Sequence, residues 1–127
     1  MFSKNYDVAP QHVDFQGVVD GLYYPFYFEW ARHAFMAEVL GLDIEEEFKL
    51  GRVHMLLEYS LKFKKSLKAS DKVVVTCRPV KSEKRNRVNF EQKILVDNVI
   101  YAEAVFIATC LVNGRPSIPE SLAILLE

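Results

Sequence analysis

The feature that most constrains the fold is an aromatic segment, residues 23–40, in which few directions around a helix would be polar. Its apolar and aromatic members are Tyr23, Tyr24, Phe26, Tyr27, Phe28, Trp30, Ala31, Ala34, Phe35, Ala37, Val39 and Leu40. Only Glu29, Arg32 and His33 form a narrow polar strip, so the pattern predicts a helix that is buried on most sides. Gly41 is a typical helix end. A chain with this helix needs a large apolar surface to cover it.

Strand patterns in the rest of the chain can supply that surface. The predicted strands are residues 2–9, 57–64, 72–80, 87–96 and 99–112, which are β-branched or alternate between apolar and polar residues. The pair Asp97-Asn98 favours a tight hairpin between the last two strands. Residues 42–52 are a mixed acidic segment that forms either a short helix or an ordered loop. Pro119 is a suitable first residue for a short terminal helix through Leu126.

This order of elements predicts an α+β fold. No helices lie between the later strands, so an antiparallel sheet of about five strands must curl around the aromatic helix. A chain of 127 residues fits one domain, 1–127. A single-layer sheet leaves its edges and outer face uncovered, and association of identical chains can cover them. We therefore expect a homodimer, or a homotetramer built as a dimer of dimers.

Charge and composition exclude several classes of function. The net charge is −1 and the pI is near 6.3, so no global basic field favours nucleic acid. No apolar run approaches the ~20 residues of a membrane span, and the N-terminus lacks a signal-like pattern, so a cytoplasmic protein is expected. Cys77 and Cys110 fall in apolar strand patterns without ligand spacing, which predicts buried free thiols. Neither a metal nor another cofactor is expected.

A loop before the aromatic helix holds a candidate reactive carboxylate, Asp14. Gly17 follows three residues later and permits a tight turn, and Gly21 stands where a helix could begin. The first amides of a helix have no partners within the helix, so they are free donors near this acid. Taken alone, an aspartate in such a loop is more often a turn or cap residue.

The residues around Asp14 resemble a known signature. The pattern DxxGVVxxxxYxxxxExAR, formed here by Asp14, Gly17, Val18, Val19, Tyr24, Glu29, Ala31 and Arg32, resembles that of hotdog-fold acyl-CoA thioesterases of the 4-hydroxybenzoyl-CoA thioesterase family, including its YbgC-type members. Phe63 and Asp71 resemble a second segment of that family. The chain departs from the family pattern at Asp20, Gly21, Tyr23, Ser66 and Ser70. The resemblance implies a hotdog fold and hydrolysis of an acyl-CoA to a free acid and coenzyme A.

The resemblance also implies roles for particular residues. Asp14 would be the catalytic carboxylate, acting as nucleophile on the thioester carbonyl or as base for a water molecule. The Gly21 backbone N–H would bind the oxyanion, in keeping with the donors that a helix start offers. Tyr24 and His54 would contribute to substrate binding, since the strand that His54 begins lines the acyl pocket in this family. Asp20, Glu58 and His12 are further candidates for the site.

A group of cations at the predicted turn before residue 88, here called the basic turn, comprises Lys81, Lys84, Arg85 and Arg87. Coenzyme A carries phosphates that need such donors, so Lys84, Arg85 and Arg87 are expected to bind them. A solvated hairpin tip would explain the same charges. Two other functions stay open: a non-catalytic module that binds acyl-CoA or lipid, and a thioesterase that acts on acyl carrier protein.

Overall fold

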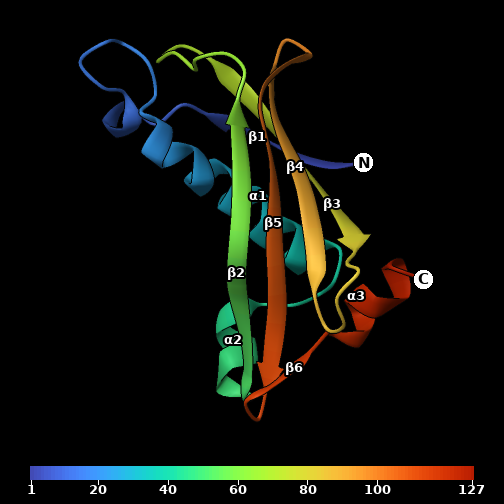
Figure 1. The fold of residues 1–127 in the computed structure, drawn as a ribbon. Coiled ribbons are helices and arrows are strands. Elements are labelled where there is room, and N and C mark those ends of the chain that lie inside the picture. Colours follow the sequence, from blue (N-terminus) through green and yellow to red (C-terminus); the bar gives the residue numbers. More distant parts are fainter.

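The computed structural model describes all 127 residues as one antiparallel sheet with a long helix, α1, across one face (Figure 1). The strands are β1 (Phe2–Asp7), β2 (Arg52–Phe63), β3 (Lys72–Lys81), β4 (Val88–Val96), β5 (Val99–Val112) and β6 (Arg115–Ser117). Their order is β1-β3-β4-β5-β2, and the short β6 pairs with β5. The predicted α+β fold, with about five main strands and a long helix, is confirmed.

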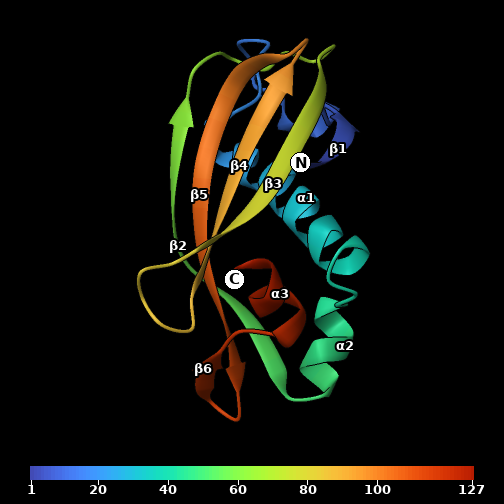
Figure 2. The ribbon, with the colours of Figure 1, turned by 90° about the vertical axis from the view of Figure 1, so that its right-hand side faces the viewer.

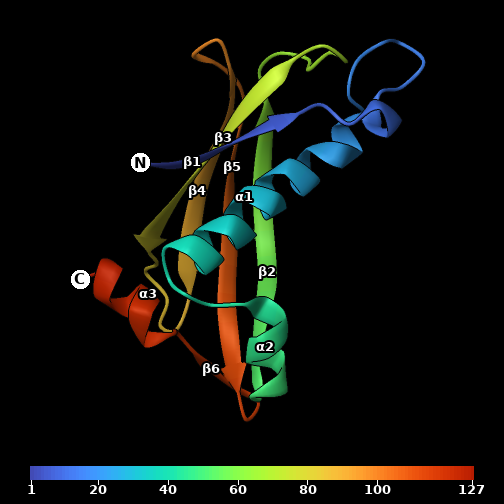
Figure 3. The same ribbon diagram turned by 180° about the vertical axis from the view of Figure 1, so that it is seen from behind.

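The helices are α1 (Tyr24–Glu38), α2 (Ile44–Lys49) and α3 (Glu120–Leu125), with 3₁₀ turns η1 (Pro10–His12) and η2 (Gly21–Tyr23) before α1. Figure 2 shows the sheet from the side, with the three helices on the same face and α3 near the lower end of α1. Seen from behind, α1 crosses the strands diagonally (Figure 3). None of these helices combines the length and apolar character that a membrane crossing requires.

Most predicted elements lie close to the observed ones, and two differ. β2 begins at Arg52 rather than Leu57, because a bulge between Leu56 and Glu58 interrupts the regular alternation that marked the later part. The second difference is the short strand β6, which is not among the predicted strands. Asn113 and Gly114 both have positive φ, the conformation of a two-residue hairpin, and therefore return the chain as another strand.

The aromatic helix buries one face against the sheet. Phe28 packs against Phe106 of β5 with ring centroids 5.4 Å apart, and Phe35 packs edge-on against Phe90 of β4 at 6.2 Å. The opposite face of α1 leaves Phe26 44% and Trp30 37% exposed. The prediction of burial on most sides therefore does not hold within a single chain, because the sheet covers only one side of the helix.

The predicted polar strip was wrong for Arg32, which lies in the core. Arg32 is 6% exposed, its Nη1 donates to Gln92 Oε1 over 3.1 Å, and its guanidinium carbon lies 4.4 Å from the centre of the Phe106 ring. Gln92 Nε2 in turn donates to the Phe28 and Thr76 carbonyls. Hydrogen bonding and the cation–π contact offset part of the desolvation of the charge. Burial lowers the pKa of the guanidinium.

A second polar group joins α2 to the start of β2. Glu47 is buried on α2 and accepts hydrogen bonds from Arg52, and its Oε1 lies 3.2 Å from His54 Nε2. Asp43 caps α2 by accepting from the Glu45 and Glu46 amides. Chiefly because Arg52 donates to it, the pKa of Glu47 lies below its ordinary value of 4.5. The contacts of Glu47 with Arg52 and His54 hold α2 against β2, which is the last strand at one edge of the sheet.

Replacing Glu47 by Gln should destabilise the fold in a pH-dependent way. The lowered pKa means that the folded chain binds fewer protons than the unfolded chain near pH 4.5, so the carboxylate stabilises fully above that value. The contribution is lost as the pH falls through the lower folded pKa. We expect Glu47→Gln to lower the free energy of unfolding by about 1–3 kcal/mol near neutral pH. The loss should shrink at about pH 3.

Urea unfolding of both chains at several pH values measures this difference. Glu45→Gln is the matched control, because Glu45 lies on the same helix but is exposed and has no ion pair. Its effect should stay within about 0.5 kcal/mol at each pH. A Glu47→Gln penalty that does not change with pH would contradict the assigned role of the carboxylate.

Candidate active site

Asp14 lies in a small hairpin that precedes α1. The Asp14 amide donates to the Val18 carbonyl over 2.9 Å, and Val13 forms a bridge with Val19. The Asp14 carboxylate accepts one hydrogen bond, from the Gln16 amide at 2.8 Å. It makes no ion pair in the chain and is partly exposed, so its second oxygen is available to another group. The tight turn follows from Gly17, whose φ is +82°.

Gly21 begins η2 on the same hairpin and offers a free donor. The Asp20 amide pairs with the His12 carbonyl, and the Asp20 side chain accepts from the Leu22 amide over 2.9 Å. The Gly21 amide itself makes no hydrogen bond within the chain, and the residue is exposed. A Cβ added at Gly21 would lie 3.3 Å from the Phe63 ring. Glycine therefore leaves the amide open beside Phe63.

Tyr24 and His12 are both buried near this hairpin, and each has a polar atom within hydrogen-bond distance of another residue. Tyr24 is buried and its hydroxyl accepts from the Leu67 amide over 3.0 Å, while its ring packs edge-on against Phe63. Burial raises the pKa of the Tyr24 phenol. His12 is buried, and its Nδ1 lies 2.9 Å from the Tyr27 hydroxyl. The substrate-binding role predicted for Tyr24 stays a prediction, and its hydroxyl already has a structural partner.

His54 lies near the start of β2, in the group with Glu47. Its side chain is 10% exposed, and Cys110 Sγ lies 3.9 Å from His54 Nε2. Cys77 and Cys110 are both buried and free, as predicted. Burial raises the pKa of Cys77 to about 12 and also raises that of Cys110, so neither thiol is primed as a nucleophile.

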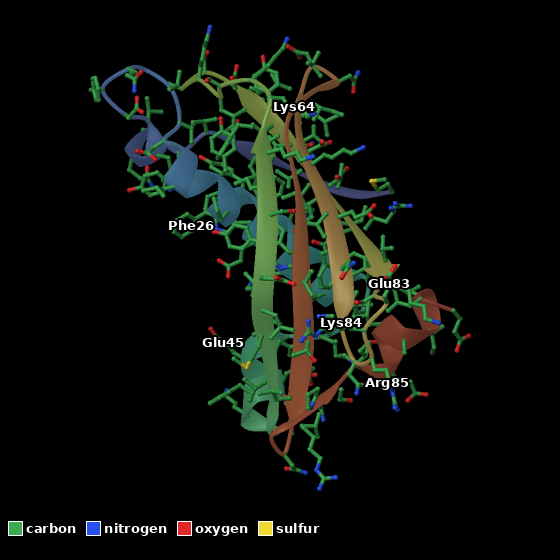
Figure 4. The ribbon with its side chains drawn as sticks, in the orientation of Figure 1. Phe26, Glu45, Lys64, Glu83, Lys84 and Arg85 are labelled. Atoms are coloured by element: carbon green, nitrogen blue, oxygen red, sulfur yellow. The ribbon has the colours of Figure 1, made fainter.

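The basic turn joins β3 to β4 and faces α3. Lys84 and Arg85 appear at the lower end of the sheet in Figure 4, beside Glu83. The turn and α3 enclose a cavity of about 280 Å³, lined by Lys81 to Arg87 together with Ile118, Ala123, Leu126 and Glu127. Thr109 of β5 holds this region in place: its Oγ1 lies 2.6 Å from the Asn86 carbonyl and 3.4 Å from that of Ser117.

The residues predicted for one site form two groups at opposite ends of the sheet. Gly21 and Tyr24 lie beside Phe63 at the end of β2. The loop before α1, which carries Asp14, lies near the same end of the sheet, at the top of Figure 1. His54 and the basic turn lie at the other end. The strand from His54 to Phe63 spans about 30 Å at roughly 3.3 Å per residue. A single chain therefore does not bring the two groups together.

Sequence reasoning missed two features of this region. Arg32 follows Phe28 by four residues and precedes Met36 by four, so the helical spacing had placed it on the buried face. Its charge was given more weight than its position. The pairing of Glu47 with Arg52 and His54 depends on how α2 folds against β2, and no local pattern reports that contact.

Comparisons with known proteins agree with this architecture. Similar solved structures include a hypothetical protein from Aquifex aeolicus, with 25% identity, 100% coverage of both chains and a TM-score of 0.88. A 1,4-dihydroxy-2-naphthoyl-CoA thioesterase from Synechocystis has 15% identity over 98% of this chain and 94% of that one, with a TM-score of 0.87. A Thermus thermophilus thioesterase complexed with coenzyme A and Zn has 18% identity over 98% and 90%, with a TM-score of 0.81.

The family match is more direct. Among curated proteins, no significant match was found. The family model described as the thioesterase-like superfamily matches residues 8–126, nearly the whole chain. It spans both the Asp14 hairpin and the basic turn, and it confirms the predicted hotdog fold and thioester hydrolase. The chain belongs to the thioesterase-like superfamily.

Proposed function

We propose that this protein hydrolyses acyl-CoA thioesters at the hairpin that carries Asp14 and Gly21. The observation that carries the proposal is the pairing, on one hairpin, of a partly exposed carboxylate with an amide that has no partner in the chain. The structural similarity to a 1,4-dihydroxy-2-naphthoyl-CoA thioesterase and to a thioesterase complexed with coenzyme A supports coenzyme A as the carrier.

The chemistry needs one group on each side of the thioester carbonyl. As the carbonyl carbon is attacked, negative charge develops on its oxygen, and the Gly21 N–H stabilises that charge. Asp14 either attacks the carbon itself or removes a proton from an attacking water. In the first case the coenzyme A thiolate leaves, and water then hydrolyses the acyl–aspartyl anhydride to the free acid and restores Asp14. In the second case the attacking water becomes part of the acid, and its proton passes through Asp14 to the leaving thiolate. The Phe63 ring beside Gly21 provides an apolar wall close to the donor.

Asp14→Asn should lower kcat by about a hundredfold or more, because it removes the charge and keeps the size of the side chain. Steady-state kinetics of free-thiol release, with thermal melting as a check on folding, measure the effect. Asp20→Asn is the matched control, since asparagine caps a helix as well as aspartate does and should leave kcat near the parent value. The reverse outcome would move the catalytic role to Asp20.

Gly21→Pro should raise the barrier by about 2.7–4 kcal/mol, because proline lacks the donor that would bind the oxyanion. Gly21→Ala is the control, since it keeps the N–H and adds a methyl group that meets the Phe63 ring at 3.3 Å. We expect the alanine variant to lose much less of kcat than the proline variant. Equal losses in two folded variants would argue against the amide as the donor.

A non-catalytic role for the hairpin is the second candidate. It is favoured by the hydrogen bond from the Gln16 amide to Asp14, which is the contact of an aspartate that supports a turn. A panel of short, long, aliphatic and aromatic acyl-CoA esters distinguishes the two, since a binding module leaves every thioester intact. The same panel defines the acyl preference.

We further propose that the basic turn binds the phosphates of coenzyme A. Four cations border a cavity that also has Ala123 of α3 and the flanking Ile118 and Leu126 on its wall, which suits a ligand with charged and apolar parts. Glu83 and Glu127 are the acids on the same wall, so the turn keeps a net positive charge. Acyl carrier protein, with its phosphopantetheine, is the competing donor.

Replacing Lys84, Arg85 and Arg87 by Ala should raise KM for an acyl-CoA and change kcat less, because ground-state contacts to the phosphates are lost. The salt dependence of KM should also flatten. An acyl-pantetheine ester, which lacks the nucleotide phosphates, is the matched control and should be unaffected. Equal losses on both esters would show that the turn serves folding or chemistry instead.

The two groups of site residues meet if two chains pair through β2, which we propose as the functional assembly. β2 is an edge strand with an unpaired side, and Met55, Leu56, Leu57, Tyr59 and Phe63 are each 42–57% exposed. Such an edge needs cover. Two-fold pairing of β2 with its copy is antiparallel, so the Phe63 end of one strand lies toward the His54 end of the other.

Light scattering at micromolar protein should therefore give at least a dimer. Mixing the Asp14→Asn chain with the chain that lacks Lys84, Arg85 and Arg87 should restore activity at substrate concentrations below KM. Random exchange of equal amounts makes about half of the dimers mixed, and each mixed dimer has one intact site out of two. The mixture should therefore show roughly a quarter of the parental activity. An active monomer, or no recovery on mixing despite proven exchange, would show that each chain builds its own site.

A further inference from the structure

A partly open cavity of about 280 Å³ lies between α1, the sheet and the C-terminal segment. It lies apart from the Asp14 hairpin, includes His54 and shares Ile118 with the cavity at the basic turn. α1 contributes Arg32 and Met36, the sheet contributes Phe90 and Ala108, and the C-terminal segment contributes Ile118 and Leu122. Exposed residues on α1 and β2, His33 and Met55, lie at its rim. Its volume is just below the range of about 300–1,000 Å³ that is typical of ligand sites, so only a small ligand would fit.

Arg32 is the buried cation of this mostly apolar cavity, and Glu29 is the acid at its rim. A guanidinium has five N–H donors, and Arg32 donates one hydrogen bond, from Nη1 to Gln92. Its other nitrogens have no partner, yet none of them is fully enclosed, since the one enclosed side-chain polar atom without a partner in the chain is Asn89 Oδ1. Arg32 therefore presents its unused donors to the cavity that it lines.

No carboxylate of the chain forms an ion pair with Arg32, and Glu29 acts on it only at longer range. Arg32 forms no ion pair within 4.0 Å. Glu29, at the rim, lies 3.8 Å from His33, and Glu47, behind His54, is bound to Arg52. A buried charge without a counter-ion is costly, and the contacts with Gln92 and Phe106 offset only part of that penalty.

We propose that this cavity binds a small apolar carboxylate, with the carboxylate on the free edge of the Arg32 guanidinium and the apolar part against Met36, Phe90 and Leu122. A guanidinium edge matches two carboxylate oxygens, and the bond is stronger in a space that excludes water. The ligand has two sources: a free carboxylic acid, or an acyl group that carries a second carboxylate at its far end. The site itself uses neither Asp14 nor Gly21.

Isothermal titration with hexanoate, and with hexanamide as its uncharged counterpart, tests the site. Hexanoate should bind saturably, and hexanamide should bind at least tenfold more weakly. Arg32→Met keeps the length of the side chain and removes the charge, so it should lower hexanoate affinity by about tenfold or more. Arg115→Met removes an exposed arginine away from the cavity and should leave the affinity unchanged.

Two further variants separate the site from the stability of the fold. Arg32→Lys keeps the charge and should retain part of the hexanoate affinity. Ala108→Leu fills the cavity, keeps Arg32 and should abolish binding in a chain that still melts cooperatively. Asp14→Asn should bind hexanoate like the parent, whatever its activity. No saturable hexanoate binding by the parent chain, or equal binding of acid and amide, overturns the proposal.

The source of the carboxylate is decided by kinetics with adipoyl-CoA and hexanoyl-CoA, which differ by one terminal carboxylate. This comparison alone rests on the proposed function. If Arg32→Met lowers kcat/KM about tenfold for adipoyl-CoA and not for hexanoyl-CoA, the ligand is the acyl group. If hexanoate binding needs Arg32 and both esters are hydrolysed as by the parent, the ligand is the free acid.

Discussion

The packing of α1 on the sheet is the contact on which the rest of the structure depends. Phe28 and Phe35 meet Phe106 and Phe90 across the interface, and these large rings bury much of the apolar area that drives folding. The position of α1 then fixes where the hairpin before it lies, and with it Asp14 and Gly21. The same contact encloses Arg32 between the helix and the sheet. The position of the Asp14 hairpin and the cavity beside Arg32 are thus both results of one interface.

The sheet has unequal edges, and this inequality shapes the proposed site. β1 closes one side as a strand of six residues, whereas β2 presents a strand of twelve residues with an apolar, exposed surface on the other. A long unpaired edge is unfavourable for an isolated chain in water. In the proposed dimer, this edge would bring the Asp14 hairpin of one chain toward the basic turn of the other, two groups that a single chain keeps apart.

The sequence predicted the strands and the long helix well, because each has a clear local period. The apolar, β-branched run of residues 99–112 and the Asp97-Asn98 turn predicted β5 with its observed bounds. Local pattern failed where a tertiary contact decided the outcome. Arg32 was placed outside because its charge favours water, and only its contacts with Gln92 and Phe106 explain its burial. Asn113-Gly114 is itself a local hairpin signal, yet the short strand that follows it was not predicted.

The candidate site likewise combines features that a local sequence pattern predicts with features that only tertiary contacts determine. Asp14 and Gly21 could be proposed from a motif, since both belong to one short segment whose spacing is visible in the sequence. The relation between that segment and His54 could not, because it depends on the length of β2 and on which strand forms the edge. The cavity around Arg32 is likewise assembled from α1, the sheet and the C-terminal residues. Residues so distant in sequence carry no shared pattern.

The contact of Thr109 with the carbonyls of Asn86 and Ser117 has a thermodynamic consequence for ligand binding. It fastens the loop between β3 and β4 and the strand leading to α3 to the same point of β5. The conformational entropy of both segments is therefore lost when the chain folds. A phosphate that arrives at the loop meets cations on a backbone that is already ordered. More of its interaction energy is then available as affinity, and less is spent on arranging the loop.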